Sequence, residues 1–230
     1  MIGFYNYTEL LTYLSLISAN LGIIISLSGK GHPYFSVFFL LFCGLCDAFD
    51  GKVARIKKDR SPTERKFGIQ IDSLSDLVAF GVLPACIGYS IMMRSPIIDM
   101  AEKVYGGKSR VFATCIAFII IVLYVLAAMI RLAYFNVTEE ERQKTESGTR
   151  KYFVGLPVTS AALIFPFIML LNYVTPYDVT PMYMGTMVLC CLAFVSRIQI
   201  KKPGFKGTMV MVGIGVIEFL LILAGKYIKF

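Results

Sequence analysis

Apolar residues arrive in this chain in blocks of about 20, roughly the length of an α-helix that crosses the hydrocarbon core of a membrane. Of the 230 residues, 57% are hydrophobic and only 17% are charged, which leaves too little polar surface for a soluble domain of this length. Short polar connections separate the blocks. The sequence therefore predicts an all-α, polytopic helical bundle in the membrane, with residues 1–230 forming a single transmembrane domain.

Seven candidate spans follow from the apolar blocks, and the sixth is the shortest. Their predicted bounds are 8–28, 34–55, 70–93, 111–136, 155–175, 181–197 and 208–228. Lys and Arg gather in the connections after the second, fourth and sixth spans, although the connection 94–110 is also basic. Because cytoplasmic loops carry an excess of Lys and Arg, we expect these three connections and the N-terminus in the cytoplasm and the C-terminus outside.

The formal charge of +8 has a simple explanation in such a chain, because basic loops face anionic lipid. There is no nucleic-acid-binding motif, so membrane lipids and not nucleic acids are the expected partners. The six cysteines all fall in apolar stretches and predict small buried side chains, even though Cys43 and Cys46 form a C-x-x-C pair. The first 20 residues lack the basic start and cleavage site of a signal peptide.

Carboxylates inside the predicted spans are the strongest functional signal. A charged acid at the centre of a span costs at least about 2.5–3.5 kcal/mol, so several of them together need compensation. Asp47 and Asp50 are spaced i, i+3, and Asp72 and Asp76 are spaced i, i+4, so each pair shares a helix face. Glu218 stands alone in the last span and receives no catalytic role.

Two such helices packed antiparallel bring the four aspartates together, where they either take up protons or gather cations. Oxygen ligands without histidine or thiolate favour Mg²⁺, Mn²⁺ or Ca²⁺ over zinc. A pair of such ions clamps the attacking and leaving oxygens of a phosphoryl transfer. Arg55, one turn beyond Asp50, is a candidate phosphate ligand, with snorkelling to the interface as the alternative. Small residues allow close helix approach or serve helix packing alone: Gly44, Gly51, Ala54 and Gly68.

A cation channel or transporter is the competing function class, because acids also line ion pathways. Such a protein spreads its acids along the depth of the membrane on several helices. Here the four aspartates cluster toward one end of two helices, with an arginine one turn away. The pattern favours phosphate chemistry.

The aspartates belong to two blocks, Asp47-x-x-Asp50-Gly51-x-x-Ala54-Arg55 and Gly68-x-x-x-Asp72-x-x-x-Asp76. Together these blocks resemble the signature of the CDP-alcohol phosphotransferase family. Every fixed residue of that pattern is present. Twelve residues separate Arg55 from Gly68, where the family usually has about eight, and the surplus lies in a polar stretch. Three further segments resemble the phosphatidylserine synthase branch, so that the resemblance covers roughly residues 15–175: 72–85, 131–136 and 152–157. Tyr134 stands where that branch often has a second arginine.

The resemblance implies a six-helix core, here with one or more extra C-terminal spans, often assembled as a homodimer around a polar cavity open to the cytoplasm. The implied reaction transfers the phosphatidyl group of CDP-diacylglycerol, or of a CDP-linked ether lipid, to the hydroxyl of L-serine, giving phosphatidylserine and CMP. Glycerol 3-phosphate or an inositol phosphate as acceptor is the alternative within the family.

The resemblance also assigns roles to residues. Two divalent ions, Mg²⁺ or Mn²⁺, are expected on Asp47, Asp50, Asp72 and Asp76. Asp76 is also the expected general base for the serine hydroxyl. The expected nucleotide and phosphate contacts are Gly51, Ala54, Arg55, Gly68 and Asn20. For Asn20, helix–helix hydrogen bonding is an equal alternative. The expected acceptor contacts are Arg131, Asn136, Arg150, Lys151 and Tyr152, with positive-inside charge as the other reading of the basic ones.

Overall fold

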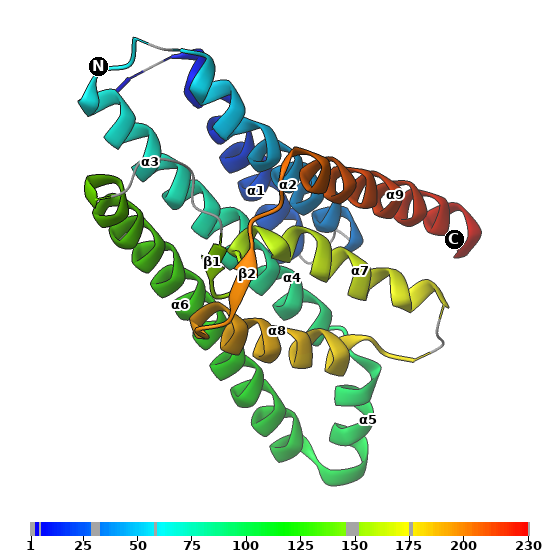
Figure 1. Ribbon diagram of the computed structural model, residues 1–230. Helices are drawn as coiled ribbons and strands as arrows, with labels where there is room; N and C mark the ends of the chain where they lie inside the picture. Colours follow the sequence, from blue (N-terminus) through cyan, green and yellow to red (C-terminus); the bar gives the residue numbers. More distant parts are fainter. Residues whose placement is uncertain are drawn as a thin grey trace.

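The computed structural model describes residues 3–4, 6–28, 33–57, 59–145, 152–174 and 177–229. The chain is an all-α polytopic membrane protein with one small two-stranded sheet in the described residues (Figure 1). Its helices are η1 (Tyr7–Glu9), α1 (Leu10–Leu27), α2 (Pro33–Ile56), α3 (Pro62–Asp76), η2 (Leu77–Val82), α4 (Leu83–Met92), α5 (Pro96–Tyr105), α6 (Gly107–Thr145), η3 (Val158–Ser160), α7 (Ala161–Val174), α8 (Thr180–Val195) and α9 (Phe205–Lys229). The strands are β1 (Tyr152–Val154) and β2 (Gln199–Lys201).

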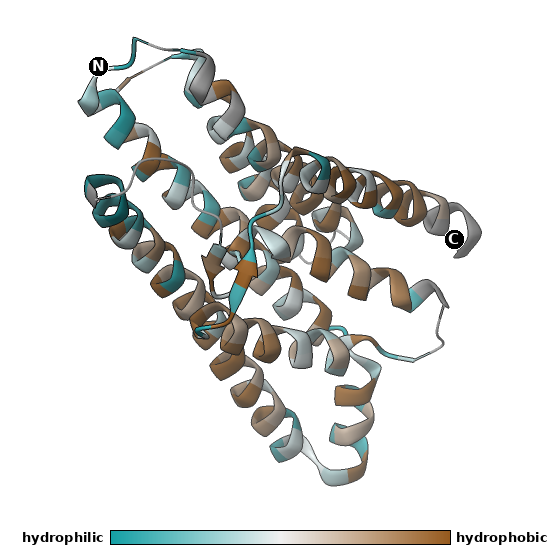
Figure 2. Cartoon of the chain, in the orientation of Figure 1, coloured by the Kyte–Doolittle hydropathy of each residue, from teal (hydrophilic) through white to brown (hydrophobic). Residues whose placement is uncertain are grey.

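Five helices of the described residues are long and apolar enough to cross a membrane: Tyr7–Leu27, Pro33–Gly51, Pro62–Met92, Gly107–Lys144 and Phe205–Ala224. The helices α7 and α8 are apolar but shorter, which was expected of the sixth predicted span but not of the fifth, predicted over 155–175. Figure 2 shows hydrophilic residues gathered where α3 begins and α6 ends. This supports the prediction of an integral, multi-pass membrane protein.

Each predicted span coincides with a helix, but two local features differ from the prediction. The third span was expected from residue 70, whereas α3 begins at Pro62. A capping box explains the earlier start, because the Ser61 hydroxyl accepts from the Glu64 amide while the Glu64 carboxylate accepts from the Ser61 amide. The connection 94–110, expected as a loop, contains α5, which packs against α6.

Small and polar residues bring α1 and α2 into close contact. Ser18 donates to the Phe39 carbonyl at 3.0 Å, and Ser36 donates to the Gly22 carbonyl at 2.8 Å. A Cβ on Gly22 would lie 2.8 Å from a Leu83 methyl group, so α4 also approaches α1 closely at this point. Such contacts are the usual means of holding membrane helices together. They fix α2, which carries two of the four aspartates.

The helix that carries the other two aspartates changes pitch directly after Asp76. Residues 77–82 form a π-helical segment, in which the Leu83 amide donates to the carbonyl of Val78. Pro84 has no amide hydrogen, so it cannot donate to the Phe80 carbonyl four residues earlier. The Tyr124 hydroxyl on α6 donates to that carbonyl instead, at 2.7 Å. A buried side chain from a neighbouring helix therefore supplies a hydrogen bond to a backbone carbonyl of the irregular segment.

The strands β1 and β2 pair in antiparallel register, with Tyr152 opposite Lys201. This contact between strands was not predicted, because each strand is only three residues long and the two are 45 residues apart in the chain. Gly155 follows β1 with φ +75°, and a Cβ there would lie 2.6 Å from the Phe194 carbonyl. The close approach requires glycine. This accounts for the glycine of the segment 152–157 that the sequence singled out.

Asp178 joins α8 to the turn between α4 and α5, at the end of the molecule away from the start of α3. The Ser95 hydroxyl donates to Asp178, and the amide and hydroxyl of Thr180 donate to it at 2.9 and 2.6 Å. Burial acts to raise the pKa of Asp178, but these hydrogen bonds outweigh it and hold the pKa below its usual range. The acid therefore serves a structural role here.

Candidate active site

The four motif aspartates lie in the C-terminal turns of two helices, Asp47 and Asp50 on α2 and Asp72 and Asp76 on α3. All four are partly buried. The side chains of Asp50 and Asp72 lie close to each other. The charges of the other three aspartates all act on Asp76. The two helix faces predicted from the spacing therefore do meet.

A polar cavity of about 610 Å³ opens beside Asp50 and Asp72, a size in the range of about 300–1,000 Å³ typical of small-ligand pockets. Its wall is formed by η1 and the start of α1, the end of α2, and the first half of α3. Gly51 and Gly68 are in the wall, as expected for residues that let a ligand approach the backbone. Three cations also line it: Lys57, Arg60 and Arg65. Carboxylates and cations thus face one space.

The donor chemistry of the site suits a hard divalent ion, because its acids offer only carboxylate oxygens. Asp50 and Asp72 already form a close pair. Within the described residues, however, no group of three or more His, Cys, Asp or Glu side chains is gathered as a ready metal site.

Two predicted acceptor residues on α6 lie next to the aspartates. Arg131 is buried, and its positive charge acts on Asp47 and Asp76. Its guanidinium lies over the rings of Phe135 and Phe153, 5.1 and 5.9 Å from their centroids. The Asn136 amide donates to the Ser73 hydroxyl at 2.7 Å. Both residues are thus held close to α3.

Other predicted site residues lie elsewhere or outside the described part of the chain. The exposed Asn20 donates to the Leu16 carbonyl of its own helix at 2.8 Å, and it does not line the polar cavity. Tyr152 is half exposed in β1. The side chains of two nucleotide residues and the whole of two acceptor residues fall outside the described residues: Ala54, Arg55, Arg150 and Lys151. Their roles stay predictions.

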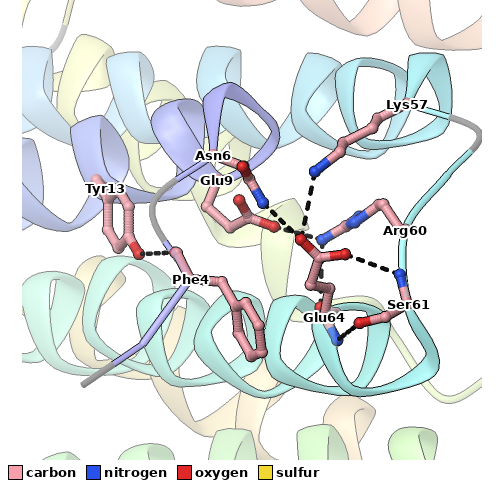
Figure 3. Close-up of polar contacts among 8 residues, drawn as sticks. All are labelled: Phe4, Asn6, Glu9, Tyr13, Lys57, Arg60, Ser61 and Glu64. Atoms are coloured by element: carbon pink, nitrogen blue, oxygen red, sulfur yellow. Dashed lines mark hydrogen bonds and ion pairs between the residues drawn. The ribbon is translucent and has the colours of Figure 1, made fainter. Parts of the chain in front are cut away.

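Several residues of the cavity wall were missed from the sequence, Glu9 and Arg60 among them. Glu9 is buried in η1 and forms an ion pair with Arg60 in the connection between α2 and α3 (Figure 3). Glu9 lies inside the predicted first span, so the rule that singled out the aspartates, an acid within a span, applied to it as well. Arg60 carried no comparable signal, because it is one of many basic residues in a polar connection.

A second cavity, of about 800 Å³, lies on another side of α2 between α2, α7, α9 and the small sheet. Its lining is mainly apolar, with Phe42, Leu163 and Phe219 among the side chains. Asp47 reaches it from α2, and Lys201 and Lys202 line it from β2 and the residue that follows. One helix therefore presents one aspartate to each cavity.

The chain matches the model of the family described as CDP-alcohol phosphatidyltransferase over residues 5–198. It belongs to this family. The match extends beyond the two motif blocks to α8, and leaves α9 outside. CDP-alcohol phosphatidyltransferases generally use divalent metal ions, which agrees with the carboxylate chemistry of the site.

Curated relatives carry related names. A CDP-diacylglycerol–serine O-phosphatidyltransferase of Saccharomyces cerevisiae is 37% identical over 60% of this chain and 43% of its own length. One of Helicobacter pylori strain J99 is 29% identical over 88% of this chain and 73% of its own length. An archaetidylserine synthase of Methanothermobacter thermautotrophicus is 31% identical over 67% of this chain and 54% of its own length. The chain thus spans less than half of the yeast relative. No solved structure matches the chain.

Proposed function

We propose that this CDP-alcohol phosphatidyltransferase transfers the phosphatidyl group of a CDP-linked lipid to the hydroxyl of L-serine, giving phosphatidylserine, or its ether-lipid counterpart, and CMP. One observation carries the proposal: a cavity lined by Asp50, Asp72 and three cations, in a membrane-embedded member of this family. The names of the yeast, Helicobacter and archaeal relatives support serine as the acceptor.

The donor would bind across the end of α2. Its nucleotide and diphosphate suit the polar cavity, where Lys57 and Arg65 supply positive charge and Gly51 and Gly68 leave room at the backbone. Its acyl chains suit the apolar cavity between α2, α7 and α9. The phosphorus that carries the lipid would then lie between the two, close to Asp47 and Asp50.

Asp47, Asp50 and Asp72 would be the main ligands of two divalent ions, Mg²⁺ or Mn²⁺, with Asp76 completing the second set. When bound, such ions neutralise the diphosphate and stabilise the charge that develops on its oxygens. The close pair of Asp50 and Asp72 supports this assignment.

Asp76 would act as the general base. The serine hydroxyl oxygen forms the new bond to the phosphorus that carries the lipid, and the bond from that phosphorus to the oxygen of CMP breaks. The hydroxyl proton passes to the Asp76 carboxylate, and CMP leaves with the bonding electrons. A positioned base of this kind contributes typically about 10²–10⁴-fold. The location of Asp76 at the end of α3, beside a π-helical segment that accepts a hydrogen bond from Tyr124, supports the role.

The serine carboxylate would pair with Arg131, whose guanidinium is held near Asp47 and Asp76 by two aromatic rings. Asn136, fixed by Ser73, would supply a hydrogen bond to serine. The predicted contacts from Arg150, Lys151 and Tyr152, and the predicted homodimer and cytoplasm-facing site, belong to the same proposal.

The test is an acceptor assay on the purified protein in detergent. CMP release from CDP-diacylglycerol would be measured with Mg²⁺ or Mn²⁺ and with L-serine, glycerol 3-phosphate or an inositol phosphate in turn. We expect release with serine only, and its loss on addition of EDTA. Release with glycerol 3-phosphate but not with serine would refute the serine assignment.

A further inference from the structure

The short helix α5 joins α4 to α6 at the end of the molecule away from the start of α3 (Figure 1). It connects two membrane-spanning segments, Pro62–Met92 and Gly107–Lys144, so it lies close to a membrane surface. None of its ten residues is buried, although most of them are apolar. The connection 94–110 is also the exception to the predicted charge pattern, because it is basic on the side where few cations are expected.

The charged side of α5 is turned inward, toward α6. Arg110, at the start of α6, donates to Asp99 at 2.9 Å and to Glu102 at 2.8 Å. The two acids are spaced i, i+3 and therefore share one side of the helix. Ser109 holds the same turn, since its hydroxyl donates to the Ala101 carbonyl at 2.9 Å. These contacts fix which side of α5 faces the protein.

An apolar stripe on the other side of α5 faces outward. Ile97, Met100 and Val104 are spaced i, i+3, i+7, and they are 48, 66 and 68% exposed. Since each residue of an α-helix is rotated by about 100° from the one before, the stripe is centred about 160° from the two acids. A helix on an aqueous surface has the reverse arrangement, with its apolar stripe against the protein. The outward stripe therefore indicates apolar surroundings on this side of α5.

Exposed apolar side chains continue from α5 into α6. Tyr105, the last residue of α5, is 78% exposed, and Val111 and Phe112 in the second turn of α6 are 63 and 69% exposed. The helix α6 is the most hydrophobic of the membrane-spanning segments in the described residues, and only 22% of its apolar window is buried. The lipid-facing surface of α6 thus extends to the helix that precedes it.

Basic residues outnumber acids at this end of the molecule. The connection 94–110 contains four basic residues and two acids, and both acids are paired with Arg110. Lys103 on α5 and Lys108 in the first turn of α6 are exposed. Lysine stems lie along apolar surface while their ammonium groups reach the polar head groups of a membrane. Anionic lipid attracts such cations.

We propose that α5 is an interfacial helix, whose stripe of Ile97, Met100 and Val104 inserts among lipids while Lys103 and Lys108 bind anionic phospholipid head groups. Helices of this kind bury their apolar face about 5–10 Å into the boundary between head groups and acyl chains. A second copy of the chain fits the stripe less well, because three side chains supply far less than the roughly 800 Å² per partner of a stable interface. The proposal does not depend on the reaction at the aspartates.

The test uses a tryptophan as a local probe, because the chain contains none. Met100→Trp places the probe in the stripe. The matched control, Asp99→Trp, places it on the charged side of the same helix, where Glu102 still pairs with Arg110. Both full-length variants would be reconstituted in vesicles of phosphatidylcholine and phosphatidylglycerol, and their fluorescence quenched by aqueous acrylamide or by lipids brominated near the head-group end of their acyl chains.

We expect brominated lipid to quench Met100→Trp at least about twofold more than Asp99→Trp, and acrylamide to give the reverse order, because the stripe lies below the head groups. Acrylamide quenching as strong in Met100→Trp as in Asp99→Trp would overturn the interfacial helix. Protection of Met100→Trp from both quenchers would overturn it as well, because a protein surface would then cover the stripe.

The choice of lipid is tested by brominating only one of the two lipids at a time. At equal mole fractions, brominated phosphatidylglycerol should quench Met100→Trp about threefold more than brominated phosphatidylcholine, because the two lysines gather anionic lipid. Adding Lys103→Gln and Lys108→Gln to the same variant should bring this ratio close to one. Equal quenching by the two lipids before the lysines are changed would overturn the binding of anionic head groups.

Discussion

The two cavities beside α2 are similar in volume but differ in the chemistry of the side chains that line them. The polar one, at the end of α2, is lined by acids and by Lys57, Arg60 and Arg65. The apolar one, between α2, α7 and α9, is lined mostly by aliphatic and aromatic side chains. Asp50 reaches the first and Asp47 the second, although they are only three residues apart. A substrate with a charged nucleotide and two hydrocarbon chains needs both environments, and α2 is where they adjoin.

The difference suggests how one short motif can serve such a substrate. Residues spaced i, i+3 lie on the same general face of a helix but are rotated by about 60° from each other. Two cavities that meet along that face therefore each receive one carboxylate. The reacting phosphorus would lie at this boundary, between the group that leaves and the group that stays in the membrane.

Removing an acid of the polar cavity should have the largest effect. Asp50→Asn or Asp72→Asn should lower serine-dependent CMP release by about 10³-fold, because charge on the diphosphate is no longer stabilised. The matched control is Asp99→Asn, which removes an acid that pairs with Arg110 at 2.9 Å and should leave release unchanged. Near-normal release in either cavity variant would mean that the polar cavity is not where the chemistry occurs.

Changing Asp76 separates proton transfer from nucleotide binding. Asp76→Asn should lower the turnover number by about 10²–10⁴-fold, because the amide cannot take the serine proton. CMP binding should be retained. Rates would be measured as CMP release, and binding by calorimetry. Full metal-dependent activity would exclude Asp76 as the base, and a simultaneous loss of Mn²⁺ binding would make its role as a ligand the essential one.

Filling the apolar cavity should affect the lipid and not the nucleotide. Gly215 lies in its wall, and a Cβ there meets Leu163 at an ordinary 3.4 Å, so Gly215→Phe can project into the space. We expect KM for long-chain CDP-diacylglycerol to rise by about tenfold, with CMP binding unchanged. Gly213→Phe, on the same helix but with nothing within 4 Å of its Cβ, is the control. Equal KM values in both variants would show that the donor lipid does not bind in this cavity.

The small sheet beside the apolar cavity should matter chiefly for stability. Gly155→Ala places a Cβ 2.6 Å from the Phe194 carbonyl at φ +75° and should cost about 1–3 kcal/mol. The measurement is thermal unfolding in detergent. Gly185→Ala, in an open position on α8, should leave the melting temperature unchanged or slightly higher. A Gly155→Ala variant as stable as the parent would show that the strand contact is not needed to hold the cavity wall.

Much of the fold could be predicted because apolar blocks of about 20 residues have few alternatives in a membrane. The pairing of Asp50 with Asp72 also followed from spacing, since helix periodicity decides which residues share a face. The sheet could not be predicted, because β1 and β2 are short and their contact depends on Gly155 meeting the end of α8. Arg60 gave no local signal either, since its position depends on Glu9, 51 residues away.

The central claim, that a CDP-linked lipid binds across the end of α2, is tested most directly by crystals of the protein grown with CDP-diacylglycerol and Mn²⁺. Anomalous scattering would locate the manganese ions independently of the lipid. We predict manganese between the aspartates of α2 and α3, with the nucleotide in the polar cavity and the acyl chains toward α7 and α9. Manganese elsewhere, or a nucleotide outside the polar cavity, would contradict the claim.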